Sequence, residues 1–415
     1  MHILFISDNF PPEVNAPASR TFEHCRRWVE AGHRVTVITC APNFPAGRVF
    51  AGYRNRLVAR ERVAGIEVIR VWSYISANEG VALRTLDYAS YMATATIAAG
   101  FVSGIDLVVA TSPQFFAACA GRAIAALRRK PFVFELRDLW PESIRAVGAL
   151  RNERLLRGLE RLELSLYRAA AAVVPVTHSF RDNLIGRGID PAKIHVITNG
   201  ADLARFAPRP KDEVLAAGLG LTSAFVAGYV GTHGMAHGLE TLLEAAARLR
   251  AIPEASNVRL VLLGAGAAKK ALQVSAAERG LANVVFLDPV PREAIARYWS
   301  LLDVAIIHLK RTPLFETVIP SKLFEAMAMG IPVLHGVKGE SAAIVKREGV
   351  GLAFESEDAV ALAAHILALS RDPALRTRLA AAGPPAARGY DRLVLADRML
   401  AVLESLVPAM RTAPA

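Results

Sequence analysis

Short runs of apolar residues alternate with helix-length amphipathic segments along the whole chain. In the first half these runs are rich in β-branched residues and mostly continuous, which is typical of parallel strands covered on both faces of a sheet. We expect strands at Ile3–Ile6, Val35–Thr39, Val68–Trp72, Leu107–Ala110, Phe132–Glu135, Val173–Val176 and His195–Thr198. Helices are expected between them, at about 17–31, 84–103, 115–129, 152–169 and 179–187. This order predicts a doubly wound α/β domain.

The same alternation starts again after residue 213. The intervening segment FAPRPKDE, at 206–213, holds two prolines and mixed charges and is the best candidate for a linker. Strands are then expected at Val226–Val230, Val258–Leu263, Val284–Leu287, Val304–Ile307, Pro332–His335 and Gly351–Phe354. Helices are expected at about 238–251, 268–279, 292–300, 321–329, 357–370 and 373–382, the last of them ended by the prolines at 384–385. The pattern predicts two similar α/β domains, 1–205 and 206–390, and a final helix at 391–406. A cleft between two such domains is a usual place for a ligand.

Composition excludes several classes of protein. The chain has 415 residues, and its 29 Gly and 23 Pro are close to ordinary usage, which excludes collagen-like or disordered composition. Cys25, Cys40 and Cys119 cannot all pair and show no CxxC spacing, so we expect a reduced, cytoplasmic setting. Residues 1–7 lack a basic lead and are interpreted as a buried strand rather than a signal peptide. The uncharged run 88–105 contains several Ser, Thr and Gly, and we expect a buried helix rather than a membrane span.

The charge is uneven along the chain. The formal net charge is +11, and residues 1–205 hold most of the excess, with 26 Lys and Arg against 18 Asp and Glu. This excess favours an anionic partner for the first half, such as a phosphate-bearing ligand, an anionic membrane or a nucleic acid. No basic motif interleaved with aromatic residues is present, so we expect no nucleic acid to bind.

The common nucleotide-binding loops are missing from their usual places. The segment after the first strand contains neither GxGxxG nor GxxxxGK[ST]. The nearest match, GAGAAKK at 264–270, has a lysine where a dinucleotide-binding loop has its third glycine. It is either a tight strand–helix turn or a turn that lines the cleft. The sequence also contains neither GxSxG nor HExxH, and we expect neither a serine-hydrolase elbow nor a metal site.

The sharpest cluster of candidate binding residues is VIPSKLFEAMAMGIPVL, at 318–334. It joins Pro320 to a short helix that Ser321 is placed to cap, with Lys322 and Leu323 in the first turn. The N–H groups of a helix start and a lysine together suit a diphosphate. Glu325 lies on the same helix face as Ser321, where a carboxylate would accept hydrogen bonds from sugar or ribose hydroxyls. The alternative is a capped surface helix with an exposed lysine and glutamate.

Two further segments follow the ends of expected strands. The turn GYVGTHGMAHG, at 228–238, is rich in glycine, and small residues there would let a ligand approach the backbone. In the first half, FELRDLWPESI places Arg137 and Asp138 just after a strand, and the opening loop holds Asn15 and Arg20. Open α/β sheets bind ligands outside the carboxyl ends of their strands. A flexible loop and a salt-bridged surface loop are the respective alternatives.

Taken together, these segments resemble the family 4 retaining glycosyltransferases of the GT-B fold. The likeness covers nearly the whole chain and is carried by FISDNFPPEVNAPASRTFEHCRRWVEAGHRVTVIT, FELRDLWPESI, ITNGADLARFAP, YVGTHGMAHGLETLLEAA and PSKLFEAMAMGIPVL. Within the family they are most similar to a subgroup of bacterial surface polysaccharide synthesis, with the fucosamine transferases of O-antigen (lipopolysaccharide) or capsule synthesis as the nearest likeness.

The resemblance implies two Rossmann-like domains facing across a cleft, with helix 391–406 packed back on the first domain. The second domain would hold a UDP-sugar and the first an acceptor, with no metal or other cofactor. The donor residues would be Gly231, Thr232, His233, Gly234, Asp288, Val290, Pro320, Ser321, Lys322, Leu323 and Glu325. Asp138 and Lys322 would be catalytic, and Asn15, Arg20 and Arg137 would bind the acceptor.

The expected acceptor is a polyprenyl-diphosphate-linked saccharide at the inner face of the plasma membrane, which would make the protein cytoplasmic or peripheral to that membrane. The segment RNERLLRGLERLELSLYR, at 151–168, interleaves arginines with leucines. It is either a contact for an anionic membrane or the solvated face of an ordinary packed helix.

The chain departs from the family pattern in two places. The family often has two glutamates in the spacing E-x7-E, but Thr317 stands where the first is expected before Glu325. An arginine and a lysine often follow the first strand of the second domain, where this chain has Thr232 and His237. A different donor sugar, such as a deoxy amino sugar, would account for the first departure. Two alternatives stay open: a UDP-N-acetylglucosamine 2-epimerase, and a degenerate, non-catalytic subunit that binds nucleotide sugars.

Overall fold

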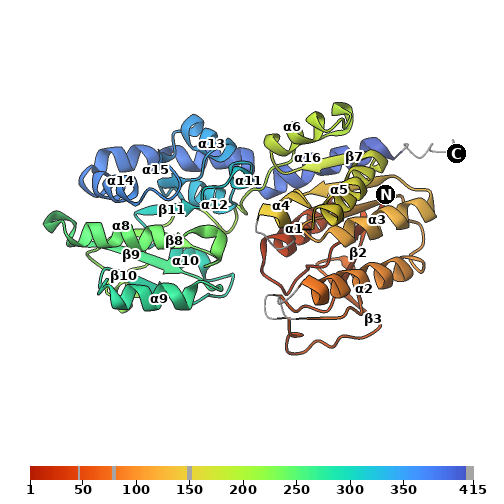
Figure 1. Ribbon diagram of the computed structural model, residues 1–415, viewed down its shortest axis with the longest axis horizontal. Helices are drawn as coiled ribbons and strands as arrows, with labels where there is room; N and C mark the ends of the chain where they lie inside the picture. The colour runs from red at the N-terminus through yellow and green to blue at the C-terminus, as the bar shows by residue number, and fades with distance from the viewer. Residues whose placement is uncertain (45–46, 77–80, 147–151, 408–415) are drawn as a thin grey trace. The chain divides into compact units, whose positions relative to one another are not determined.

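The computed structural model describes residues 1–44, 47–76, 81–146 and 152–407 (Figure 1). These residues form two units, Met1–Thr198 with the chain after Asp391, and Asn199–Asp391. The first unit therefore ends before the expected boundary at 205. The reason is that Ala201 pairs with Asp391 and, like Phe206, is buried in the core of the second unit.

The first unit is built on a seven-stranded sheet in the order β3-β4-β2-β1-β5-β6-β7. Its strands are β1 (His2–Ile6), β2 (Arg34–Cys40), β3 (Val58–Val63), β4 (Ile66–Val71), β5 (Leu107–Thr111), β6 (Phe132–Leu136) and β7 (Ala172–Pro175). All pairs are parallel except β3 with β4. The continuous apolar runs thus form buried parallel strands, as expected.

Two segments of this sheet differ from the sequence prediction. Strand β3 is not foreseen because its side chains alternate between exposed and half-exposed, which leaves no apolar run. Conversely, 195–198 is not a strand. The N–H groups of His195 and Ile197 donate to the carbonyls of Val173 and Pro175, at 2.9 and 3.0 Å, but the nearest bridge is an isolated one between Ile194 and Val173.

Helices cover both faces of this sheet (Figure 1). One face packs against α2 (Val81–Ala99), α3 (Phe115–Arg128), α5 (Glu153–Ala169) and α6 (His178–Gly186). The other packs against α1 (Ala16–Glu30) and α16 (Arg392–Leu406), and the short α4 spans Glu142–Ala146. The indole N–H of Trp28 on α1 donates to the carbonyl of Ala396 on α16 at 2.9 Å, which fixes the last helix to the first unit. No helix among the described residues is long and apolar enough to span a membrane.

The second unit is built on a six-stranded parallel sheet in the order β10-β9-β8-β11-β12-β13. The strands are β8 (Phe225–Val230), β9 (Val258–Leu263), β10 (Val284–Leu287), β11 (Val304–His308), β12 (Val333–Gly336) and β13 (Gly351–Ala353). One face packs against α8 (Glu240–Arg250), α9 (Lys269–Glu278) and α14 (Ala359–Arg371). The other packs against α10 (Ile295–Trp299), α12 (Lys322–Met329) and α13 (Glu340–Glu348). The remaining helices are α7 (Glu213–Gly218), α11 (Pro313–Glu316) and α15 (Pro373–Ala387).

The prolines near the end of the second unit do not end their helix where the sequence predicts. Pro384 and Pro385 lie inside α15, which continues to Ala387. The helix is held here by close packing on α12, because a Cβ on Gly383 would lie 2.5 Å from the carbonyl oxygen of Met327. Tertiary contact therefore outweighs the local preference of proline to end a helix.

Candidate functional site

The second sheet changes direction at its centre. From β8 the chain builds outward through β9 and β10, then returns to the other side of β8 for β11 and the strands after it. Such switch points are where open α/β sheets bind ligands, outside the carboxyl ends of the strands. The glycine turn follows β8 at this point, and Lys322 on α12 lies against it, since a Cβ on Gly231 would meet the lysine side chain.

Lys322 is the central cation of this site. Its Nζ donates to the hydroxyl of Tyr229 at 2.7 Å and lies 4.2 Å from the centre of that ring. A Cβ added to Gly231 would lie 2.1 Å from Cε of Lys322 and 2.5 Å from Nζ, so a larger residue here would displace the end of the lysine side chain. Gly231 also has a φ of 137°, which disfavours other residues. The two motifs that the sequence singled out are therefore in contact.

The ammonium group of Lys322 is poorly solvated. Burial lowers its pKa from 10.5 to about 8, and the carboxylate of Glu325 only partly opposes this. The group is still mostly protonated at neutral pH, and its charge has little compensation from the protein. An anion placed beside it would restore a normal pKa and gain a charge-assisted hydrogen bond.

Ser321 does not cap α12 as the sequence predicts. Its own backbone is already helical (φ −58°, ψ −25°), and its side chain makes no capping hydrogen bond. The N–H groups of Leu323 and Phe324 instead donate to the carbonyls of Pro320 and Ser321, at 3.0 and 3.1 Å. Leu323 is fully buried in the core, so its side chain is a packing group rather than a donor contact.

A second glycine turn supports the first. A Cβ on Gly264 would lie 1.9 Å from the carbonyl oxygen of Gly231, and one on Gly266 would lie 2.4 Å from that of His233. The segment GAGAAKK is thus a tight turn that packs on the glycine turn at 228–238, rather than a dinucleotide-binding loop. Thr232 contributes its carbonyl, which accepts the Tyr229 hydroxyl at 2.8 Å.

His233 is enclosed by these turns. Its ring is fully buried, and neither ring nitrogen has a hydrogen-bond partner among the described residues. Burial, together with the charges of Lys269 and Lys322, lowers its pKa to about 4. His233 is therefore neutral at physiological pH. Gly234, the next glycine of the turn, begins the short 3₁₀ segment Met235–His237.

The expected base-binding segment follows the edge strand β10. Asp288 is 93% exposed and pairs with Nζ of Lys269 at 2.7 Å. The same ammonium donates to the carbonyls of Gly264 and Leu287, at 2.8 and 2.9 Å, and so ties the ends of β9 and β10 together. Val290 is half-buried two residues further on.

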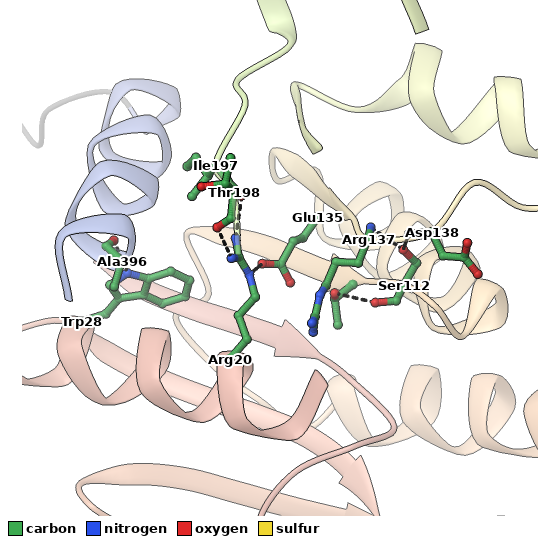
Figure 2. Close-up of polar contacts among 10 residues, drawn as sticks. Arg20, Trp28, Ser112, Glu135, Arg137, Asp138, Ile197, Thr198 and Ala396 are labelled. Atoms are coloured by element: carbon green, nitrogen blue, oxygen red, sulfur yellow. Dashed lines mark hydrogen bonds and ion pairs between the residues drawn. The ribbon is translucent and has the colours of Figure 1, made fainter. Parts of the chain in front are cut away.

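In the first unit, the expected acceptor residue Arg20 has a structural place (Figure 2). It is 4% exposed, and its Nε donates to Glu135 at 2.7 Å. Its two terminal nitrogens donate to the carbonyls of Thr198 and Ile197, at 2.6 and 3.0 Å. Burial alone would raise the pKa of Glu135, but the guanidiniums of Arg20 and Arg137 outweigh it and lower the pKa to about 2. Arg20 therefore holds residues 197–198 to β6, and each of its three nitrogens already donates to the protein.

Arg137 and Asp138 lie at the carboxyl end of β6, as expected (Figure 2). The hydroxyl of Ser112, which sequence reasoning missed, accepts both of their backbone N–H groups, at 2.7 and 3.2 Å. Nε and Nη1 of Arg137 are buried without a hydrogen-bond partner among the described residues, and burial lowers the pKa of this group to about 10. Asn15 caps α1 by accepting the N–H of Ala18 at 2.8 Å.

Comparisons with known proteins identify the family. Residues 18–205 match the family model described as Glycosyltransferase Family 4, and residues 218–384 match the model described as Glycosyl transferases group 1. The chain belongs to these glycosyltransferases. The enzyme class expected from the sequence is thereby confirmed. Among the described residues no three His, Cys, Asp or Glu side chains gather closely enough to hold a metal ion, and the expectation of metal-free catalysis stays a prediction.

Named relatives of this glycosyltransferase act in several pathways. It is 25% identical over 338 residues to WcaI of Escherichia coli (strain K12), assigned to colanic acid biosynthesis, with 80% of this chain and 82% of that one covered. It is 29% identical over 262 residues to D-inositol 3-phosphate glycosyltransferase 1 of Catenulispora acidiphila, with 61% of each covered. The structure of Alr3699/HepE of Anabaena with UDP-glucose has a TM-score of 0.73 at 19% identity, covering 98% of this chain and all of that one. The GT-B fold is thus confirmed.

Proposed function

We propose that this glycosyltransferase transfers a sugar from a UDP-sugar to a lipid-linked saccharide during synthesis of a bacterial surface polysaccharide. The observation that carries the donor half is the Lys322 ammonium, which is seated against Gly231 at the switch point with little compensating charge. A pyrophosphate suits that place, and the likeness in fold to a protein that holds UDP-glucose supports uridine as the nucleoside.

Each donor residue then has a definite task. Lys322 stabilises the negative charge that develops on the leaving UDP, and Gly231 leaves space for the lysine side chain beside the turn. Glu325 holds the ribose hydroxyls, and the backbone at 288–290 meets the base. The bond from the anomeric carbon to UDP breaks while a bond to the acceptor oxygen forms on the same face. Because the new bond forms on the face that UDP leaves, the anomeric configuration is retained. The acceptor proton passes to the leaving phosphate oxygen.

The acceptor half rests on Arg137 and Asp138, which Ser112 fixes at the end of β6. Asp138 orients the acceptor hydroxyl, and the buried guanidinium of Arg137 offers charge to a diphosphate carried by the acceptor. Asn15 stays a candidate contact, whereas we assign Arg20 a structural role, because it is 4% exposed and each of its nitrogens already donates to the protein. Thr317 in place of a family glutamate supports a deoxy amino sugar, such as N-acetylfucosamine, as the donor sugar.

The experiment is a screen of UDP-sugars that measures UDP release with and without lipid extract. We expect one deoxy amino sugar to give the fastest release, dependent on the extract, and Asp138→Asn to lower transfer without changing UDP binding. A strict preference for UDP-glucose would contradict the sugar assignment. An epimerised UDP-sugar without lipid product would identify an epimerase instead, and UDP binding without turnover would identify a degenerate subunit.

We also propose that α5 meets an anionic membrane. Arg154, Arg157 and Arg161 are exposed on it, beside Leu155 and Leu162 with 56% and 41% of their surface exposed; Arg151 lies outside the described residues. Cationic and apolar groups on one helix face suit a lipid surface. Sedimentation with liposomes is expected to require anionic lipid and to fail when the three arginines are changed to glutamate. Equal binding of both proteins would remove this assignment.

A further inference from the structure

The first sheet also has a switch point, between β1 and β5. From β1 the chain builds through β2 and β4 on one side, then starts again at β5 and continues through β6 and β7 on the other. A cavity of about 60 Å³ lies at the carboxyl ends of these central strands, bounded by the loops after β1 and β2, by α2 and by the start of α3. This is room for about four water molecules, comparable to the polar edge of one sugar ring.

Three carboxyl groups line this cavity, from Asp8, Glu13 and Asp87. Glu13 is only 4% exposed, and its Oε1 accepts the N–H groups of Asn43 and Phe44, at 2.8 and 2.9 Å. Its Oε2 is buried with no hydrogen-bond partner among the described residues. A buried carboxylate oxygen without a partner is costly, and in a residue that lines a cavity at a switch point it indicates a missing hydrogen-bond donor.

The charge of the cavity says which ligands it excludes. None of its described lining residues is Lys or Arg. Burial raises the pKa of Asp8 to about 6, and burial together with the charge of Asp8 raises that of Asp87 to about 6. The nearby guanidinium of Arg84 is directed to the hydroxyl of Tyr88, at 2.9 Å. The guanidinium of Arg70, which donates to the carbonyl of Cys40, offsets part of the charge of Glu13. A phosphate would still meet net negative charge from the three carboxyl groups, whereas hydroxyl or ammonium groups would meet acceptors.

We propose that this cavity binds a ring of the acceptor saccharide through its hydroxyl or amino groups, and that it rejects a phosphorylated ring. The proposal rests on the proposed function and adds to it the class of acceptor. It assigns acceptor recognition to Asp8, Glu13 and Asp87, none of which the sequence motifs singled out. It also sets this chain apart from relatives named for D-inositol 3-phosphate, whose named acceptor carries a phosphate.

The test is equilibrium binding of simple sugars to the full chain, followed by saturation-transfer NMR at pH 7.5. The probes are the methyl glycosides of glucose, galactose and mannose, the matching amino glycosides, and the matching 6-phosphates. UDP is titrated in the same samples. The variants are Glu13→Gln, which keeps an oxygen for Asn43 and Phe44, and Asp87→Asn, with Asp182→Asn on the exposed face of α6 as the matched control.

We expect at least one neutral or amino glycoside to bind, and its 6-phosphate to bind at least about tenfold more weakly. Glu13→Gln and Asp87→Asn are each expected to weaken the amino glycoside by about tenfold and to narrow the gap to the phosphate, while Asp182→Asn changes nothing. Three results would overturn the inference: the 6-phosphates bind as tightly as the parent glycosides, both cavity variants bind glycosides as the wild type does, or no glycoside binds. If the wild-type chain still binds UDP in these samples, the proposed function is unaffected. Failure of the wild-type chain to bind UDP would instead count against the proposed function.

Discussion

Replacing Lys322 with methionine is expected to remove most transfer activity and yet to stabilise the second unit. Burial lowers the pKa of this lysine from 10.5 to about 8, a difference that corresponds to at most about 3.4 kcal/mol against the charged form. The substitution also removes the hydrogen bond to Tyr229, about 1 kcal/mol, and the ammonium–ring contact, about 0.5–1 kcal/mol. The expected net gain in the free energy of unfolding is about 1–2 kcal/mol.

The pH dependence follows from the direction of the shift. Because the pKa of Lys322 is lowered in the folded protein, the penalty is fully present below pH 8. It declines as the pH rises from 8 to 10.5, where the folded protein has lost the proton and the unfolded chain still holds it. The stability advantage of Lys322→Met should therefore be largest near pH 7 and smaller at pH 9.5.

Scanning calorimetry at both pH values, with and without UDP, measures these effects. Each kcal/mol should raise the melting temperature of a unit of this size by about 2–4 °C. Turnover of the variant should be about 10²–10³-fold below that of the wild type. UDP should stabilise the variant much less than it stabilises the wild type. Lys346→Met, on the exposed face of α13, is the matched control and should change neither quantity. A Lys322→Met protein that melts lower and still gains full stabilisation from UDP would refute the reasoning.

Three further predictions concern the glycine turn, the Arg20–Glu135 ion pair and the contact of α1 with α16. Gly231→Ala should lose UDP binding and about 1–3 kcal/mol of stability, because of the positive φ at this position and the clash with the lysine side chain. The control Gly158→Ala, in α5, should be neutral or stabilising by up to about 1 kcal/mol. Thermal melts of both variants with and without UDP measure the difference. Arg20→Met should cost about 3–5 kcal/mol in urea unfolding at pH 7. The pKa of Glu135 is held at about 2, so the wild type should lose this stability as the pH falls from about 4.5 to 2, and a variant with the same acid dependence would contradict the pairing. Trp28→Phe should cost about 1 kcal/mol by releasing the backbone of α16, and faster hydrogen exchange of that helix would report it.

The sequence predicts the two sheets well because most of their strands are buried on both faces, and such strands are continuous apolar runs. Strand β3 escapes prediction because no side chain in it is buried. The segment 195–198 looks like a strand but is joined to β7 only by hydrogen bonds from His195 and Ile197, next to an isolated bridge at Ile194. Gly383 explains why α15 runs past the point where its prolines would end an isolated helix.

The candidate site is only partly readable from the sequence. The glycine turn and Lys322 are visible as motifs, and the rule for parallel strands brings them to one edge of the sheet. Tyr229 and Ser112 carry no signal of their own, because their roles depend on which backbone atoms lie opposite them. Glu135 does leave a trace, since it is a charged residue inside an apolar run, and it marks the ion pair that occupies Arg20.

The central claim is that the pyrophosphate of the donor lies beside the glycine turn, against the Nζ of Lys322. A crystal structure with UDP tests it most directly. We predict phosphate oxygens within about 3.2 Å of Nζ of Lys322 and next to the backbone of Gly231. A nucleotide bound elsewhere, with the lysine still directed only to Tyr229, would contradict the account.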